Sequence, residues 1–186
     1  MKVFRGFDHL PAFVHPAVTV GSFDGVHLGH RALLERLVAE ARAAGGESVV
    51  VTFDPHPRIV LGRAEGLRLL TSFDRKIELL AALGVDCVVV IPFDRTFSAL
   101  SGAAFVADFL IGRIGAETLV AGYDHCFGHD RVAVSSLRVP GLRIVRIDER
   151  RVTGEHVSST AIRRLLDEGR TEEAERLLGH RYLNEK

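Results

Sequence analysis

Cysteine is scarce in this sequence, which has only Cys87 and Cys126 among its 186 residues. They lie far apart, without the close pairing of a zinc site or the cysteine density of a disulfide-stabilised secreted domain. No hydrophobic run approaches the length of a membrane span, and Asp8 and His9 stand where a signal peptide would keep an apolar core. We therefore expect a cytoplasmic protein, neither secreted nor inserted into a membrane.

The sequence also lacks an excess of either charge, because 24 basic residues balance 24 acidic ones. The basic excess that marks many nucleic-acid-binding domains is missing, so an anionic ligand must be bound by a local site. With 47% hydrophobic residues, a chain of this length can close one sizeable core. We expect a single domain over residues 1–186 that acts on small molecules, without nucleic-acid or membrane partners.

Short β-branched runs alternate with amphipathic stretches along the chain. The runs, which we expect to form buried strands, cover residues 17–20, 48–53, 85–91, 117–121 and 142–147. The stretches with helical period cover residues 30–44, 72–83, 102–114, 159–168 and 171–178. This alternation predicts parallel βαβ units, and so an α/β fold with a central parallel sheet flanked by helices.

Two stretches without clear periodicity, residues 54–70 and 122–140, follow the second and fourth predicted strands. Open α/β sheets bind their ligands at the carboxyl ends of strands, and long loops in compact domains often carry function. Both loops are therefore candidates for the walls of a substrate site.

The strongest local signal is GSFDGVHLGH, residues 21–30, between the first strand and the first long helix. Its glycines allow a sharp turn and a close approach to a ligand, and the helix that follows offers free N–H groups to an anion. The spacing of the glycines differs from the fingerprint of dinucleotide-binding folds, and the Lys-Ser/Thr ending of a P-loop is absent. Both of those nucleotide-binding folds are therefore disfavoured. His27 and His30, three residues apart, can point both rings into one phosphate site. Asp24 either caps the helix or helps to organise Mg²⁺, and we favour the cap.

A second signal is HVSSTAIRRLL, residues 156–166, where hydroxyl side chains begin a helix and Arg163 follows one turn later. Exposed amides at a helix start favour an anion, and the planar Arg163 guanidinium can bind one through two hydrogen bonds. Arg164 faces elsewhere on the helix.

Together these two segments resemble the HxGH and ISSTxIR-like motifs of the nucleotidyltransferase superfamily. The resemblance implies a Rossmann-like fold in which His27, His30 and Arg163 act on the phosphates of ATP during adenylyl transfer. The other residues that it implies for ATP binding are Gly21, Ser22, Phe23, Asp24, Gly25, Gly29, Ser158, Ser159 and Thr160. Mg²⁺ would arrive with the nucleotide, and no dedicated metal site is expected.

Four further segments narrow the resemblance to one family. VTFDPHP at residues 51–57, LLTSFDRKIELL at 69–80, AGYDHCFG at 121–128 and AERLLGHRY at 174–182 stand in the order of the adenylyltransferase module of bacterial FAD synthetases. The resemblance implies that AMP passes from ATP to FMN, giving FAD and pyrophosphate. That family's riboflavin kinase module would begin near LGHRY, so we expect it to be absent here.

The Asp54–Pro57 turn is rigid, because two prolines fix their own φ and bias the residues before them toward extended conformations. On physical grounds it is either a structural corner or a wall of the substrate site, and the resemblance favours the wall. The flavin-binding residues that the resemblance implies are Pro55, His56, Pro57, Asp124, His125 and Phe127. Lys76 is expected to be an ordinary solvated lysine.

The chain departs from the family pattern in the loop after the fourth strand. His125 stands where the family usually has phenylalanine, and the segment from Gly128 to the fifth strand is shorter than usual, without the usual intervening helix. Two alternatives to FMN adenylylation follow. One is nucleotidyl transfer to another phosphate-bearing small molecule, and the other is a non-catalytic nucleotide-binding module.

We predict that His30→Ala lowers kcat far more than it weakens ATP binding. A donor aimed at charge that develops in the transition state is worth about 3 kcal/mol, or on the order of a hundredfold in rate. His27→Ala should behave similarly in steady-state assays. Wild-type turnover in both variants, with only a raised KM for ATP, would make the histidine pair a binding feature alone.

Overall fold

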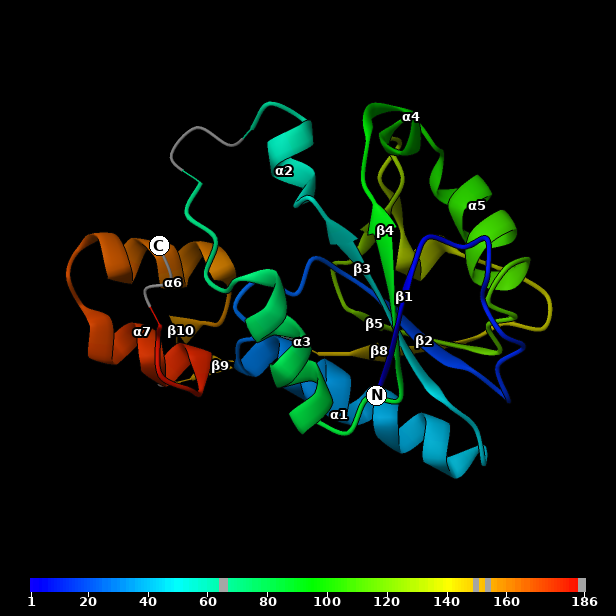
Figure 1. The fold of residues 1–186 in the computed structure, drawn as a ribbon, viewed down its shortest axis with the longest axis horizontal. Helices are drawn as coiled ribbons and strands as arrows, with labels where there is room; N and C mark the ends of the chain where they lie inside the picture. Colours follow the sequence, from blue (N-terminus) through cyan, green and yellow to red (C-terminus); the bar gives the residue numbers. More distant parts are fainter. Residues whose placement is uncertain (64–66, 149–150, 153–154, 184–186) are drawn as a thin grey trace.

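The computed structural model describes residues 1–63, 67–148, 151–152 and 155–183. Six strands form one sheet in the order β1-β4-β3-β2-β5-β8, and all of its pairings are parallel (Figure 1). The strands are β1 Lys2–Arg5, β2 Ala17–Val20, β3 Ser48–Asp54, β4 Cys87–Pro92, β5 Thr118–Gly122 and β8 Arg143–Ile147. The predicted α/β fold with a central parallel sheet is confirmed.

The sequence prediction missed β1, the edge strand that pairs with β4 from Lys2↔Cys87 to Arg5↔Val90. Three of its four residues are exposed, so it lacks the buried β-branched run by which the inner strands are recognised. The five predicted strands begin and end within two residues of their predicted positions.

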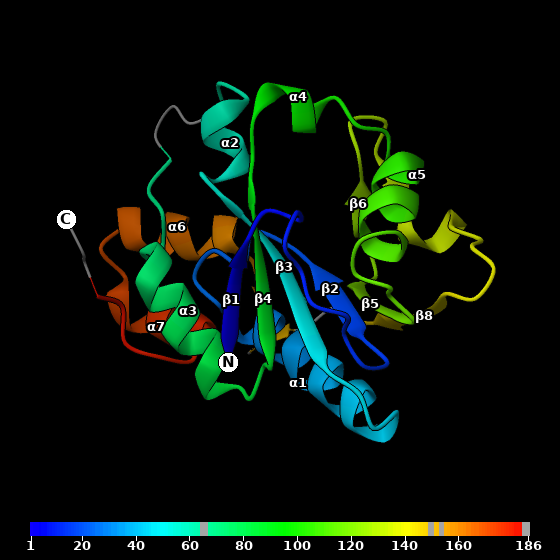
Figure 2. The same cartoon turned by 45° about the vertical axis from the view of Figure 1, so that its right-hand side comes forward.

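Helices cover both faces of the sheet, as Figure 2 shows. On one face α1 (Leu28–Ala43) and α3 (Phe73–Ala82) bury Leu34, Leu37 and Leu80 against Val50 and Val88. On the other face α5 (Gly102–Ala104) and the π-helical segment η1 (Phe105–Ile111) pack against alternate residues of the same strands. Successive strand residues thus serve opposite layers, which is why the strand sequences are almost continuously apolar.

The helix predicted over residues 102–114 is mostly of a different type. Its backbone bonds span five residues, with Gly112 N donating to Ala107 O at 2.9 Å and Ile114 N to Phe109 O at 3.1 Å. The predicted helix is therefore present as α5 and η1 up to Ile111, and the spacing of its apolar side chains did not distinguish the π-helical from the α-helical type.

Both predicted loops contain short elements. The first holds α2 (Pro57–Val60), and the second holds the hairpin of β6 (Cys126–Phe127) and β7 (Val132–Ala133), followed by the 3₁₀ turn η2 (Val134–Ser136). The short helix α4 (Arg95–Ser98) follows β4, and a second hairpin joins β9 (Arg151–Val152) to β10 (Glu155–His156). Residues 122–140 contain no α-helix, as the sequence predicted.

The last two helices, α6 (Ser159–Asp167) and α7 (Thr171–Leu178), form a separate small cluster. They lie together at the left of Figure 1, away from α5, and bury Ile162, Leu165 and Leu178 around Leu70. None of the helices in the described part of the chain has the length and hydropathy that a membrane span requires.

The order of the strands reverses at β2. From there the chain builds β3 and β4 on one side, and β5 and β8 are added on the other. A crevice forms outside the carboxyl ends of parallel strands at such a reversal, and it is the usual ligand site of open α/β sheets. The glycine turn after β2 and the loop after β5 meet there.

Candidate active site

The glycine turn leads from β2 directly into α1, and its histidines are fixed at the helix start. His27 is the N-cap of α1, and its Nδ1 accepts a hydrogen bond from the His30 backbone N–H at 3.2 Å. The two imidazoles stack with ring centroids 3.6 Å apart and an interplanar angle of 14°. The spacing of three residues thus brings both rings together, as the sequence predicted.

Both imidazoles are neutral at pH 7. Burial, followed by the charge of His156, lowers the pKa of His27 to about 4. Burial, with His27 and Lys76 nearby, holds the pKa of His30 well below its ordinary value. Because His27 Nδ1 is an acceptor, its neutral ring carries the proton on Nε2, so it can donate a hydrogen bond without being charged.

A cavity of about 360 Å³ opens beside the two histidines, at the reversal of strand order. It joins segments that are far apart in the sequence, because the glycine turn, the loop after β5 and the start of α6 all line it. The predicted site residues in its wall are Gly21, Ser22, Phe23, His27, Gly29, His30, Asp124, His125 and Ser158.

The hydroxyl-rich segment also lies against the glycine turn. Ser158 caps α6 by accepting from Ala161 N at 3.2 Å, and the Ser159 hydroxyl donates to the Asp24 carbonyl at 3.0 Å. Thr160 is exposed. Asp24, Gly25, Ser159, Thr160 and Arg163 do not line the cavity wall, although Arg163 is tied to the turn through Asp24.

Asp24 does not cap α1, so that prediction is wrong. Its carboxylate accepts from Leu70 N at 2.8 Å and from Thr71 N at 3.4 Å, and it forms an ion pair with Arg163. Gly25 and Val26, with φ of 85° and 39°, turn the chain between Asp24 and the helix start, so His27 takes the capping position.

The ion pair distinguishes the two adjacent arginines. The Arg163 side chain is 12% exposed and also donates through Nε to the Arg68 carbonyl at 2.7 Å. The Arg164 side chain is 62% exposed and lies 4.0 Å from Glu168. Arg163 therefore faces the glycine turn and Arg164 faces solvent.

The prediction of a solvated Lys76 is also wrong. The residue is 8% exposed and its Nζ lies at the glycine turn, 3.1 Å from the Ser22 carbonyl oxygen. A four-carbon side chain can reach this point from α3, which no pattern of helical spacing reveals.

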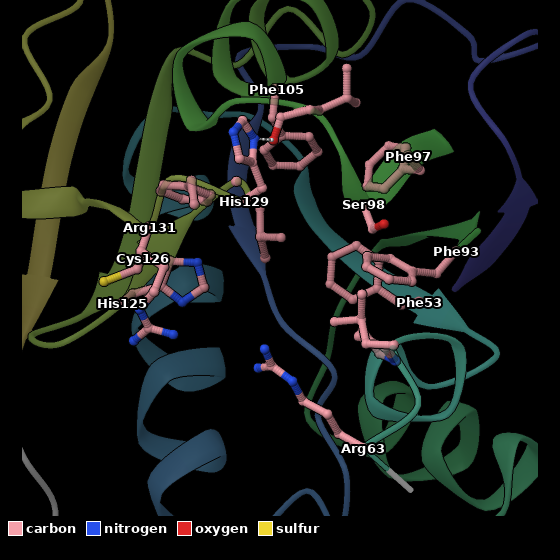
Figure 3. A pocket seen from close by; sticks show the side chains of 16 residues that line it. Phe53, Arg63, Phe93, Phe97, Ser98, Phe105, His125, Cys126, His129 and Arg131 are labelled. Carbon is pink, nitrogen blue, oxygen red and sulfur yellow. Dashed lines mark hydrogen bonds between the residues drawn. The ribbon is translucent and has the colours of Figure 1, made fainter. Parts of the chain in front are cut away.

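A second cavity, of about 390 Å³, is also lined by residues that follow β5 (Figure 3). Phenylalanine rings dominate its wall, and Arg63, His129 and Arg131 add polar groups. The rings of Phe53 and Phe93 lie 5.3 Å apart, and those of Phe93 and Phe97 5.7 Å apart. His125 and Val20 line both cavities, so the two cavities adjoin at these residues.

Three of the six predicted flavin residues, Pro57, His125 and Phe127, line the second cavity. Asp124 lines the first, whereas Pro55 and His56 line neither; His56 instead caps α2 through Nδ1, which accepts from Arg58 N at 3.2 Å. Sequence reasoning missed four phenylalanines of the wall and two arginines, namely Phe53, Phe93, Phe97, Phe105, Arg63 and Arg131. The eleven phenylalanines of the chain were the available signal.

The polar residues near the β6–β7 hairpin are engaged in backbone contacts. Asp130 accepts from Gly102 N at 2.8 Å, and His129 Nδ1 lies 3.2 Å from the Leu100 carbonyl. In the described part of the chain, no three histidine, cysteine or acidic side chains are grouped so that they could hold a metal ion.

Comparison with solved structures agrees with this fold. A Streptococcus pneumoniae structure described as a macrolide-efflux protein is 26% identical, with a TM-score of 0.86 over 96% of this chain and 61% of its own. A pantoate-β-alanine ligase from Francisella tularensis, 13% identical, matches 95% of this chain and 86% of its own with a TM-score of 0.53. The ligase is similar in fold alone.

Two curated relatives are named bifunctional riboflavin kinase/FMN adenylyltransferase. The Listeria monocytogenes protein is 36% identical over 91% of this chain and 55% of its own length. The Escherichia coli K12 protein is 34% identical over 98% of this chain and 60% of its own length. The chain therefore spans little more than half the length of these relatives. The family model for FAD synthetase matches residues 12–161, and the chain belongs to the FAD synthetase family.

Proposed function

We propose that this chain transfers the adenylyl group of ATP to FMN, giving FAD and pyrophosphate. The observation that carries the proposal is the pair of adjoining cavities. One is lined by the glycine turn, two histidines and a helix start, which suit the phosphates of a nucleotide. The other is lined by phenylalanine rings, which suit a flat aromatic group such as isoalloxazine.

The shared wall of the two cavities fits the reaction. An acceptor whose ring system lies among the phenylalanines would present its phosphate near His125 and Val20, where the nucleotide cavity begins. An oxygen of that phosphate attacks the α-phosphorus of ATP. The new O–P bond forms as the bond to the β-phosphate oxygen breaks, and pyrophosphate leaves with the electron pair.

The residues of the chain position the substrates and stabilise charge, without a covalent intermediate. His27 donates through Nε2–H to the phosphates, and His30 lies beside it with a buried Nδ1 that has no partner among the described residues. The Arg163 guanidinium, held by Asp24, supplies an oriented hydrogen-bond donor at the glycine turn. Mg²⁺ would arrive bound to the ATP phosphates and so would need few ligands from the protein.

The direct test incubates purified protein with Mg-ATP and FMN and measures FAD by chromatography and pyrophosphate by a coupled assay. We expect both products in equal amounts. Pyrophosphate release only with another phosphate-bearing acceptor would show that the chain is a nucleotidyltransferase with a different substrate. ATP binding without turnover of any acceptor would favour a non-catalytic module.

Arg163→Lys should reduce turnover strongly although it keeps the charge, because the ammonium group loses the planar geometry that contacts Asp24 and the Arg68 carbonyl. Arg164→Lys is the matched control and should be nearly silent, since Arg164 faces solvent. Steady-state kinetics of both variants provide the comparison. Equal losses would mean that Arg163 is not the arginine of the phosphate site.

A different acceptor is the second candidate, and the polar ring of His125 in the shared wall favours it. If FMN is the acceptor, His125→Phe should tighten FMN binding by about 0.5–1.5 kcal/mol, because a phenylalanine ring at this position can stack on the isoalloxazine. ATP affinity should stay the same. If His125 hydrogen-bonds another acceptor, the substitution should weaken that acceptor and leave FMN turnover low. Fluorescence titration of FMN against both proteins separates these outcomes.

A further inference from the structure

Lys76 reaches from α3 to the underside of the glycine turn without lining either cavity. Its Nζ donates to the Ser22 carbonyl at 3.1 Å and lies 3.4 Å from the Thr52 hydroxyl oxygen. The Thr52 hydroxyl donates to the same carbonyl at 3.3 Å. One carbonyl oxygen therefore accepts from two donors, which come from α3 and β3.

The position of Lys76 is electrostatically costly. Burial lowers the pKa of its ammonium group, and Asp24 and Asp54 oppose that shift only at longer range. Among the described residues Lys76 forms no ion pair, and the oxygens that it contacts are neutral. Burying a cation among neutral oxygens costs free energy whatever its role, so a role in the site would account for a lysine at this position.

The peptide that Lys76 holds is the one that leads into Phe23. Among the described residues the only cis peptide bond is Asp54–Pro55, so the Ser22–Phe23 peptide is trans. In a planar trans peptide the N–H points opposite to the C=O. With the Ser22 carbonyl directed at Lys76, the Phe23 N–H points away from it.

That N–H donates to no other group of the described chain. Ser22 and Phe23 both line the cavity that contains His27 and His30. An unpaired amide in such a wall is a suitable donor for a phosphate oxygen.

The backbone around this peptide is strained. Phe23 has a φ of 48°, in the left-handed region that a bulky side chain rarely adopts. Such a conformation persists only where the surrounding structure enforces it, and it is common at ligand sites. The hydrogen bonds to the Ser22 carbonyl act on the residue directly before the strained position.

We propose that Lys76 is a positioning residue, which fixes the Ser22 carbonyl so that the Phe23 N–H donates to the ATP phosphates. The inference rests on the proposed adenylyl transfer, but it does not depend on FMN as the acceptor.

Kinetics of four variants test the proposal. Lys76→Met should lower kcat about tenfold or more with a much smaller change in the KM for ATP. A misdirected Phe23 N–H would stabilise the transition state less, while ATP binding in the ground state changes little. Thr52→Val removes the second donor without changing charge and should lower kcat in the same direction by less. Lys76→Arg should restore part of the loss. Lys2→Met makes the same chemical change at an exposed lysine of β1 and should be silent.

A silent Thr52→Val together with full activity of Lys76→Arg would mean that the charge alone matters, which overturns the positioning role. If kcat fell across Lys76→Met, Lys76→Arg and Thr52→Val only in proportion to the loss of thermal stability, Lys76 would likewise be a structural residue and the positioning role would be overturned.

A spectroscopic measurement needs no acceptor. In ¹⁵N-labelled wild-type protein, Mg²⁺ with a non-hydrolysable ATP analogue should move the Phe23 amide proton downfield, and in Lys76→Met this shift should disappear while the Gly29 amide still responds. An unmoved Phe23 amide in the wild type, or the same shift in both proteins, overturns the proposal. If Lys76→Met does not fold, Thr52→Val takes its place. If the Phe23 amide responds as expected but no FAD forms, the positioning role of Lys76 stands and only the assignment of FMN as the acceptor is overturned.

Discussion

The contact on which the candidate site depends is the buried ion pair between Asp24 and Arg163. Asp24 belongs to the glycine turn and Arg163 to α6, which packs with α7 away from α5 and η1 (Figure 1). The same carboxylate accepts from Leu70 N, where the loop after β3 returns to the core. Three segments thus meet at one side chain, and the pair fixes their relative positions.

A buried ion pair adds little net stability, but losing one partner typically costs about 3–5 kcal/mol because the other charge is left uncompensated. The Asp24–Arg163 pair therefore specifies geometry more than it stabilises the fold. Arg163 could approach a phosphate with its guanidinium already oriented, so less side-chain entropy would be lost on binding. This arrangement matches the proposed chemistry, in which the chain contributes positioning and charge stabilisation and forms no covalent bond to the substrate.

Local patterns allowed much of the fold and part of the site to be predicted. The four inner strands are runs of mostly buried residues rich in β-branched side chains, and the edge strand β8 keeps the apolar Ile144, Val145 and Ile147. The glycine turn with His27 and His30 is contiguous, so its geometry follows from short-range rules. The roles of Asp24 and Lys76 could not be predicted, because their partners lie 24 to 139 residues away. Strand β1 and the π-helical type of η1 were missed for another reason, since an exposed strand lacks the buried apolar run and the apolar spacing of η1 fits either helix type.

The same reasoning explains why the acceptor is harder to predict than the nucleotide. The wall of the first cavity comes mainly from two recognisable motifs, the glycine turn and the start of α6, whereas the second cavity takes Phe53 from β3, Phe97 from α4 and Phe105 from η1. Each of these rings is an ordinary apolar residue in its own segment, and only the fold brings them together. If the proposed function is right, substitutions in the second cavity would change the acceptor while the site for adenylyl transfer stays intact. His125 is the polar side chain common to the two walls among the described residues, so in the proposed reaction a change there would bear on how the acceptor phosphate meets ATP as well as on which acceptor is bound.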